Sequence, residues 1–350
     1  DLGLGHILDF VPNHMGIATR TNLWWRDVLE NGPGSPGARF FDIDWTPLKA
    51  TLKAKLLLPI LGDQYGRVLE RGELVLAFVD GFLVVRHFDY EVPINPKYAP
   101  LVLRRAVAPL TNELGAESPT LHEFLSILTS LQNLPDLTDD AAAAVEPEVA
   151  TEDRPRHEAL VEDRQREKEV ARARLTRLIA ECPSVGEQIE AAIRDINGEV
   201  GRPESFNALH ELLELQAYRL SYWRTASHQI NYRRFFDVNG LAGLRVEDPG
   251  VFAATHALLG KLIERGSVQA VRIDHPDGLF DPARYFDMLQ GLGSGELYVL
   301  AEKILSSQES LPARWAVAGT TGYSFLNELN GLFISRTDAR RMLSTYAKLT

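Results

Sequence analysis

Short continuous runs of apolar residues, each ending in polar residues, occur near both ends of the chain. They lie at residues 6–11 (HILDFV), 268–273 (VQAVRI), 297–301 (LYVLA) and 316–318. Runs of this length and composition are typical of strands buried in a parallel sheet. A helical pattern at residues 282–290 separates two of the runs. This alternation of strand and helix predicts an α/β fold.

The middle of the chain has a different pattern. Two apolar segments, residues 74–79 and 82–86, flank Asp80-Gly81. We predict a β-hairpin there, because a two-residue Asp-Gly turn suits the positive φ angles of a tight hairpin. Helices are predicted at residues 119–131, 156–181 and 206–230, with a loop at 31–37 and an irregular linker at 134–155. Residues 151–181 hold eight acidic and eight basic side chains, which predicts a solvent-exposed helix stabilised by pairs at i,i+4.

Composition narrows the function classes. The chain has 350 residues, 45% of them hydrophobic and 24% charged, which excludes a disordered chain. Its net charge of −11 argues against nucleic-acid binding, and its one cysteine excludes internal disulfides. We expect no metal and no cofactor, because no ligand cluster or phosphate loop stands out. No apolar stretch approaches about 20 residues, so no membrane span is expected, and without a secretory signal we expect a cytoplasmic location.

The ends of the predicted strands carry the candidate chemistry. Arg272 and Asp274 are two residues apart, so they share one face of a strand, where the guanidinium keeps the carboxylate ionised. Glu302 follows an apolar run, which favours a protonated carboxyl suited to a general acid. One ionised and one protonated carboxyl group together form the arrangement used for glycosidic bond cleavage. The alternative is that each carboxylate is a helix cap or a surface ion pair. Asp9 is interpreted as a buried, hydrogen-bonded structural carboxylate.

Four short segments resemble signature regions of the alpha-amylase clan of glycoside hydrolases. They are Asp9–His14 (DFVPNH), Phe236–Asn239 (FDVN), Arg272–His275 (RIDH) and the segment that ends in Glu302, and they occur in the order of the clan. Longer segments at residues 24–45, 230–248, 272–282 and 318–333 resemble the maltooligosyl trehalose synthase family within that clan. Because the first residue is Asp1 rather than Met, we expect the chain to be an internal fragment of a longer protein.

The resemblance implies a fold and a division of the chain. It implies part of a (β/α)8 TIM barrel, about strands 3 to 6, with a large insertion of helices and β-hairpins after strand 3. The corresponding parts are barrel residues 1–45, inserted residues 46–228 and barrel residues 229–350. The family also has a third catalytic carboxylate after a later strand. No matching His-Asp segment follows Gly322, so this group is expected outside the chain.

The resemblance also implies roles for single residues. Asp274 corresponds to the nucleophile, Glu302 to the acid/base and Arg272 to the residue that holds Asp274. The family's substrate-binding positions would be Asp9, Asn13, His14 and His275, with His14 in the donor subsite and His275 on the acceptor side. Aromatic side chains available for sugar faces are Trp24, Trp25, Trp45, Tyr65, Tyr232 and Tyr323. Histidines outside the motifs are interpreted as structural or surface residues, among them His87, His210 and His256.

The implied reaction is an intramolecular transglucosylation. The reducing-end α-1,4 linkage of a maltooligosaccharide becomes an α,α-1,1 linkage, with retention through a double displacement. The expected partners are the maltooligosaccharide substrate and, functionally, a maltooligosyl trehalose trehalohydrolase. Two alternatives stay open from the residues alone: an α-glucan hydrolase or other transglycosylase of the clan, and an inactive glucan-binding fragment.

Overall fold

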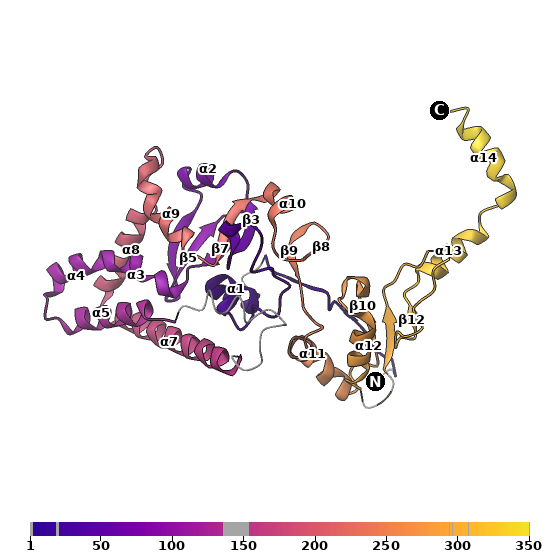
Figure 1. The fold of residues 1–350 in the computed structure, drawn as a ribbon, viewed down its shortest axis with the longest axis horizontal. Helices are drawn as coiled ribbons and strands as arrows, with labels where there is room; N and C mark the ends of the chain where they lie inside the picture. Colours follow the sequence, from indigo (N-terminus) through magenta and orange to yellow (C-terminus); the bar gives the residue numbers. More distant parts are fainter. Residues whose placement is uncertain are drawn as a thin grey trace. The chain divides into compact units, whose positions relative to one another are not determined.

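A computed structural model describes residues 3–18, 21–135, 154–293, 295, 297–306 and 308–349 (Figure 1). The chain folds into two compact units. Unit 1 comprises Asp1–Met15 and Leu244–Thr350, and unit 2 comprises Gly16–Gly243. The division into residues 1–45, 46–228 and 229–350 stays a prediction. The predicted linker at 134–155 lies almost wholly outside the described residues.

Unit 1 is built on a four-stranded sheet in which every pairing is parallel. The strands are β1 (Ile7–Phe10), β10 (Ala270–Ile273), β11 (Tyr298–Ala301) and β12 (Gly319–Thr320), in the order β1-β10-β11-β12. The first three confirm the predicted strands, but the expected burial is wrong for β1, which lies at the edge of the described sheet with its residues exposed or half-buried. The fourth begins one residue after the predicted run at 316–318 ends. Among the described residues the sheet is open, so the partial barrel stays a prediction.

Among the described residues, four helices belong to unit 1. They are α11 (Pro249–Glu264), α12 (Pro282–Gln290), α13 (Tyr323–Leu332) and α14 (Ala339–Tyr346), with short 3-10 turns at Pro276–Gly278 and Arg336–Asp338. Helices α11 and α12 precede β10 and β11 and bury apolar residues, whereas α13 and α14 follow the last strand and have no buried residue. Helix α12 is the one predicted at 282–290. Asp281 caps it by accepting a hydrogen bond from the Arg284 N–H at 3.1 Å, and Pro282 follows at the first position, where a missing N–H costs nothing.

His256 belongs to the core of unit 1, which confirms its structural interpretation. Its ring stacks on Phe252 at 4.0 Å between centroids, and its Nε2 lies 2.9 Å from the Tyr285 hydroxyl. Burial lowers the pKa of His256 to about 4, against the favourable hydrogen bond to the Phe252 carbonyl. The imidazole is therefore neutral at pH 7 and serves as a packed, hydrogen-bonded core group.

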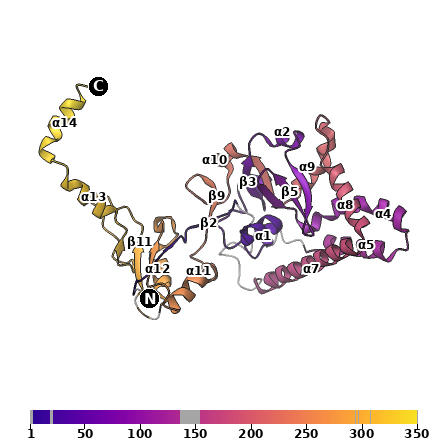
Figure 2. The same ribbon diagram turned by 180° about the vertical axis from the view of Figure 1, so that it is seen from behind.

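Unit 2 contains the segments with the mixed pattern, and Figure 2 shows its strands from behind. Its strands are β3 (Leu56–Leu61) paired in parallel with β7 (Tyr218–Tyr222), the antiparallel set β4 (Val75–Val79), β5 (Phe82–His87) and β6 (Tyr90–Pro93), and the antiparallel pair β8 (Arg234–Phe235) and β9 (Val238–Gly243). Strand β2 spans His14–Gly16. Asp80 and Gly81 have φ angles of 51° and 85°, so the predicted hairpin is confirmed.

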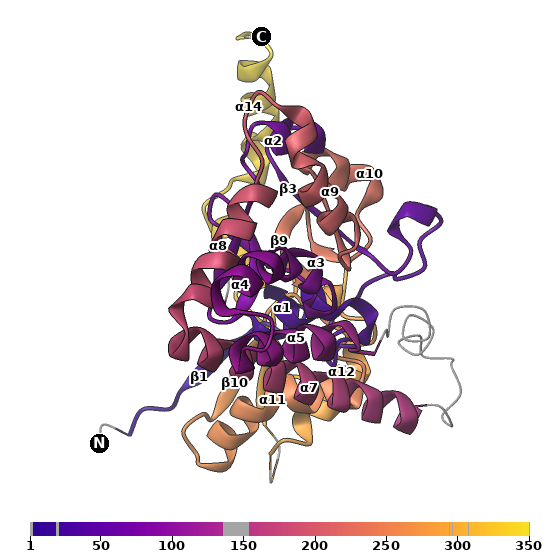
Figure 3. The ribbon, with the colours of Figure 1, turned by 90° about the vertical axis from the view of Figure 1, so that its left-hand side faces the viewer.

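The helices of unit 2 gather around these strands. They are α1 (Leu23–Asn31), α2 (Tyr65–Glu70), α3 (Pro100–Leu103), α4 (Val107–Leu114), α5 (Pro119–Gln132), α7 (Arg154–Glu181), α8 (Pro183–Ile196), α9 (Asn207–Glu214) and α10 (Ala226–Gln229). Single 3-10 turns follow at Gly32–Gly34, Ala50–Leu52, Pro96–Tyr98, Arg104–Ala106, Pro203–Phe206 and Trp223–Thr225. Helices α5 and α7 pack side by side, and Figure 3 shows α3, α4, α5 and α8 close together. The predictions at 119–131 and 156–181 are confirmed.

The single helix predicted at 206–230 is wrong. Helix α9 ends at Glu214, and the chain then enters strand β7. Gln216 marks the break, because its side chain donates to the Leu212 carbonyl at 2.5 Å and accepts from the Asn95 N–H at 2.8 Å. Beyond it the buried residues Tyr218 and Leu220 alternate with less buried ones. The loop predicted at 31–37 also begins later, because α1 continues through Asn31.

Helix α7 also corrects an expectation, because one of its faces is not solvent-exposed. Its buried stripe holds Val161, Arg164, Lys168, Ala171, Leu175 and Leu178. These positions recur every three or four residues, which is the spacing of one helix face. The outward face carries an exposed i,i+3 ion pair between Arg166 and Asp163 at 2.9 Å, and one pair of the predicted i,i+4 kind, between Arg177 and Glu181 at 3.9 Å. The helix is therefore amphipathic, with two charged residues on its buried side.

Candidate active site

Arg272 is the centre of a cluster of carboxylates in unit 1. Its Nη1 donates to Asp9 Oδ1 and to Asp274 Oδ1, both at 2.8 Å, and its Nη2 lies 3.2 Å from Glu302 Oε1. The register explains the first contact, because Asp9 pairs with Arg272 across β1 and β10. The expected contact between Arg272 and Asp274 is present. Three strands thus bring their acidic residues to one guanidinium.

Asp274 and Glu302 follow directly after β10 and β11, at the carboxyl end of the sheet. The backbone N–H of Asp274 donates to the Phe10 carbonyl at 2.9 Å, and that of Glu302 donates to the Ile273 carbonyl at 2.8 Å. Each residue therefore extends the backbone hydrogen bonding of the parallel sheet by one residue, which fixes the position of its Cα atom at the carboxyl end of the sheet. The side chains are 22% and 24% exposed, so a ligand can reach both carboxyl groups.

The electrostatics of the cluster centre on one cation. Partial burial lowers the pKa of Arg272, but the hydrogen bond and charge of Asp9, together with Asp274 and Glu302, outweigh it and raise the pKa. The Asp9 side chain is 65% exposed, so its interpretation as a buried carboxylate is wrong, although it is hydrogen-bonded as expected. Glu302 does not sit in apolar surroundings, because it faces Arg272 and its Oε2 accepts the His275 N–H at 3.1 Å.

The residues that the family motifs place around the substrate lie next to this cluster. His275 adopts a left-handed backbone, with φ 48° and ψ 50°. Asn13 is buried, and its side-chain amide lies 3.3 Å from His14 Nδ1. Gly278 explains the close packing, because a Cβ there would lie 2.6 Å from the His275 ring and 2.8 Å from Asn13 Oδ1. Glycine at position 278 therefore allows the side chains of His275 and Asn13 to pack against the backbone of this loop.

The aromatic residues proposed for sugar contacts occupy different environments. Trp25 is 3% exposed and packs edge-on against Phe41 and Tyr232. Trp24 is half-buried against Phe40, and Tyr65 bonds His210 through its hydroxyl at 3.0 Å. Trp45 and Tyr232 are buried. Tyr323 begins α13 in unit 1 and is 37% exposed.

Unit 2 holds a cavity of about 250 Å³, which none of Arg272, Asp274 and Glu302 lines. Its wall includes the aromatic side chains of Trp25, Tyr90, Trp223 and Tyr232 and the polar side chains of Asn22, Arg26, Glu91 and Asn239. Sequence analysis singled out Trp25 and Tyr232 but missed Tyr90 and Trp223. Trp223 lies in the segment 206–230 that was predicted as one helix, and β6 was not predicted.

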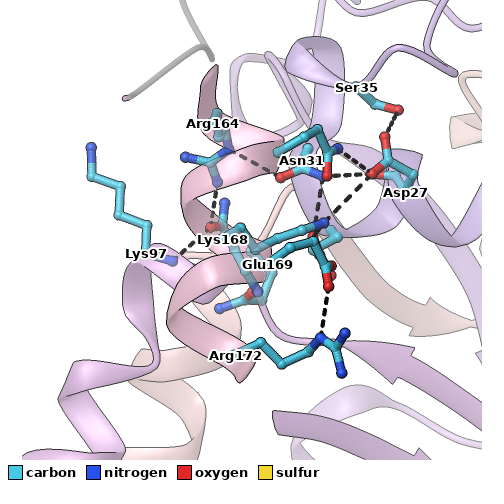
Figure 4. A network of polar contacts seen from close by, with 12 residues as sticks. Asp27, Asn31, Ser35, Lys97, Arg164, Lys168, Glu169 and Arg172 are labelled. Atoms are coloured by element: carbon cyan, nitrogen blue, oxygen red, sulfur yellow. Dashed lines mark hydrogen bonds and ion pairs between the residues drawn. The ribbon is translucent and has the colours of Figure 1, made fainter. Parts of the chain in front are cut away.

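A buried polar network joins α1 to α7 in unit 2 (Figure 4). Lys168 Nζ lies 2.5 Å from Glu30 Oε1, and both side chains are 7% exposed. Arg164 donates to Asn31 Oδ1 at 3.1 Å and to Asn95 Oδ1 at 2.8 Å. Burial raises the pKa of Glu30, and Lys168 opposes this shift. The network therefore holds the two helices together through groups that have lost their water.

The known proteins to which this chain is similar belong to one class of enzymes, the trehalose-forming synthases. The particular relatives are maltooligosyl trehalose synthases, which this chain resembles along nearly its whole length. A curated protein of Mycobacterium tuberculosis with that provisional name is 27% identical over 334 residues, covering 95% of this chain and 28% of that protein. This confirms the resemblance found in the motifs. The chain spans less than a third of the curated relatives it matches. No family model matches.

Solved structures agree with the curated relatives. The maltooligosyltrehalose synthase of Arthrobacter ramosus is 28% identical with a TM-score of 0.58, and the match covers 97% of this chain and 29% of that one. The glycosyltrehalose synthase of strain DSM5389 is 25% identical with a TM-score of 0.59, covering 99% and 33%. The fold of the chain is therefore shared with a part of these proteins.

Two further observations bear on the function class. Among the described residues, no group of three or more His, Cys, Asp or Glu side chains is placed to hold a metal ion. No described helix is both long enough and apolar enough to cross a membrane.

Proposed function

We propose that this protein converts the reducing-end α-1,4 linkage of a maltooligosaccharide into an α,α-1,1 linkage. The observation that carries the proposal is the shared guanidinium, since Arg272 bonds Asp274 and pairs with Glu302. Retaining enzymes need two carboxyl groups only about 5 Å apart, and the shared contacts of Arg272 bring the two groups together. The similarity to maltooligosyl trehalose synthases supports the choice of substrate.

The reaction follows from the positions of the two carboxyl groups. Asp274 attacks the anomeric carbon of the penultimate glucosyl residue, and Glu302 gives its proton to the departing oxygen of the reducing-end glucose. Glu302 then accepts the proton of the anomeric hydroxyl of the released glucose, which attacks the glycosyl-enzyme and frees Asp274. Arg272 keeps Asp274 oriented and ionised before the attack and after its release.

The grouping of carboxyl groups supports the proposed stabilisation of the transition state. The positive charge that develops on the sugar ring in the transition state faces the carboxylates gathered around Arg272. Asn13, His14 and His275 line the same end of the sheet in unit 1, where their polar atoms are suited to sugar hydroxyls. In the proposal these three residues bind the substrate.

The product leads to the proposed partner. Its terminal α,α-1,1 unit is joined to the remaining glucan by an α-1,4 bond, so a hydrolase of that bond releases trehalose. We propose a maltooligosyl trehalose trehalohydrolase as this functional partner, with both enzymes acting in the cytoplasm.

Incubation of the protein with maltopentaose tests the proposal. We expect reducing ends to disappear while the number of glucosyl residues per molecule stays constant. A gain in reducing ends would instead show an α-glucan hydrolase, and no change in either quantity would support glucan binding without turnover. Both of these outcomes would overturn the proposal.

The roles of the residues are tested by matched variants. Asp274→Asn should abolish isomerisation and side hydrolysis together, because both pass through the same glycosyl-enzyme. Asp287→Asn on the exposed face of α12 makes the same chemical change away from the cluster and should leave turnover unchanged. Turnover retained in Asp274→Asn would exclude this residue as the nucleophile.

A further inference from the structure

Lys303 follows Glu302 directly in the chain and bridges two loops of unit 1. Its Nζ lies 3.1 Å from Asp277 Oδ2, in the turn after β10, and 2.8 Å from Glu309 Oε1, in the loop after β11. We propose that Lys303 is a positioning residue, which holds the turn after β10 in place and thereby fixes the carboxyl group of Glu302 for proton transfer. This inference rests on the proposed function, which assigns Glu302 as the acid/base.

The environment of Lys303 differs from that of an ordinary surface lysine. Its side chain is only 16% exposed, whereas lysines usually keep their charged end in water. The hydrogen bonds with Glu309 and Asp277 raise the pKa of Lys303, so the ammonium group keeps its charge throughout the neutral range. Three N–H donors on one nitrogen allow both contacts at the same time. The two carboxylates therefore hold the ammonium group between the loops.

The contact with Asp277 determines the position of a short turn. Asp277 is the middle residue of the 3-10 turn Pro276–Gly278, which follows the left-handed backbone of His275. The Gly278 N–H donates to the His275 carbonyl at 3.1 Å, which closes the turn on itself. Because the turn is a single closed unit, a contact that fixes Asp277 also fixes the backbone of His275.

His275 transmits this constraint to Glu302. The backbone N–H of His275 donates to Glu302 Oε2 at 3.1 Å, while Glu302 Oε1 lies 3.2 Å from Arg272 Nη2. A carboxyl group that is held at both oxygens keeps one orientation, which is what proton transfer to a departing oxygen requires. A looser turn would weaken the contact at Oε2 and leave the contact at Oε1 in place.

Glu309 holds the other end of the bridge. Its Oε2 accepts the Ser306 N–H at 3.2 Å, and its own N–H donates to the Ser306 carbonyl at 3.1 Å. The hydrogen bonds with Lys303 and Ser306 lower the pKa of Glu309, so this partner stays ionised. Glu309 thus ties Lys303 within the loop after β11, whereas Asp277 ties it to the turn after β10. The two partners should therefore differ in their effect on catalysis.

Turnover of maltopentaose in matched variants tests this role. Lys303→Met keeps most of the apolar stem and removes the charge. We expect its kcat to fall about tenfold to a hundredfold, while KM changes less than about threefold because Lys303 does not touch the substrate in the proposal. Asp277→Asn should lower kcat to a similar degree, and adding it to Lys303→Met should lower kcat little further, since both changes break the same contact. Glu309→Gln should have a smaller effect.

Lys261→Met is the matched control, because it makes the same chemical change at an exposed position of α11 in the same unit and should leave kcat unchanged. A kcat of Lys303→Met equal to that of Lys261→Met would overturn the positioning role. Thermal unfolding of each variant shows whether a loss of turnover reflects a loss of fold.

A donor that needs no proton separates an effect on Glu302 from general damage. With α-maltosyl fluoride, Asp274 forms a bond to the anomeric carbon while the C–F bond breaks, and fluoride leaves with the bonding electrons and without a proton. The first release of fluoride per enzyme molecule should therefore stay within about threefold of the wild type in Lys303→Met. A loss as large as that for maltopentaose would contradict the proposal, because it would not act through the acid.

Hydrogen exchange tests the bridge without turnover. Amides at residues 275–279 should exchange about tenfold faster in Lys303→Met than in the wild type, and at the wild-type rate in Lys261→Met. Equal exchange in Lys303→Met and the wild type would show that the bridge does not hold the turn, whatever the activity. A wild-type chain that does not isomerise maltopentaose would refute the proposed function, whereas an active Lys303→Met with wild-type kcat refutes only the positioning role.

Discussion

Replacing Lys168 by methionine tests how the buried network holds α7 on α1. Methionine keeps most of the length and apolar volume of the lysine stem, so the change removes mainly the charge. Lys168 Nζ lies 2.5 Å from Glu30 Oε1 and 3.9 Å from Asp27 Oδ1. Without Lys168, the carboxylate of Glu30 stays buried with no cation beside it.

The size of the effect follows from this burial. Removing one partner of a buried ion pair costs about 3–5 kcal/mol, because the remaining charge is desolvated without compensation. Arg166→Met on the outward face of α7 is the matched control. It breaks an ion pair with Asp163 whose side chains are 65% and 57% exposed, and such pairs contribute at most about 1 kcal/mol.

The dependence on pH separates charge from packing. Burial already raises the pKa of Glu30 above its ordinary value of 4.5, and loss of Lys168 raises it further. The penalty in Lys168→Met is therefore complete above the folded-state pKa. It declines as the pH falls through that pKa, because Glu30 then becomes neutral in the folded protein. Glu30→Gln in the Lys168→Met background should restore much of the loss at pH 7.

Urea unfolding followed by circular dichroism measures these free energies. The reasoning would be refuted if Lys168→Met cost no more than Arg166→Met. It would also be refuted if the cost were the same at pH 7 and at pH 4.5, because the uncompensated charge of Glu30 would then not be its source.

Two further predictions concern unit 1. The pKa of His256 is lowered from 6.5 to about 4, so the unfolded chain binds a proton at a higher pH than the folded chain does. The free energy of unfolding should therefore fall by about 3 kcal/mol as the pH drops from 6.5 to 4. His256→Gln should flatten this part of a plot of urea midpoint against pH, and an unchanged slope would contradict the assignment. Gly278→Ala places a Cβ 2.6 Å from the His275 ring and should lower turnover of maltopentaose about tenfold to a hundredfold. Gly295→Ala is the control, because a Cβ there has nothing within 4 Å. Equal turnover in the two variants would show that the close packing at Gly278 has no catalytic consequence.

The first three strands of unit 1 were predictable because each lies in a short, mainly apolar run that ends in polar residues. Strand β12 was displaced in the prediction because it consists only of Gly319 and Thr320, which carry no pattern. Strand β7 falls within residues 206–230, which were predicted as one helix. What ends the helix is the Gln216 side chain, and one of its partners, Asn95, is far away in the sequence.

The candidate site was predictable only where its contacts are local. Arg272 and Asp274 share a strand face, so their spacing alone predicts their contact. The arrival of Asp9 and Glu302 at the same guanidinium depends on the register of three strands, which spacing within one strand does not determine. Lys168 is a similar case. Its burial depends on Glu30, 138 residues earlier in the chain, and a charged helix pattern does not reveal such a partner.

The sharing of Arg272 has a consequence for the net charge of the proposed active site. One guanidinium faces the carboxyl groups of Asp9, Asp274 and Glu302, so the cluster stays negative even when one of the three is protonated. If the cluster is the active site proposed above, we expect it to repel phosphorylated and uronic-acid glycans. It would then favour neutral glucans by charge alone.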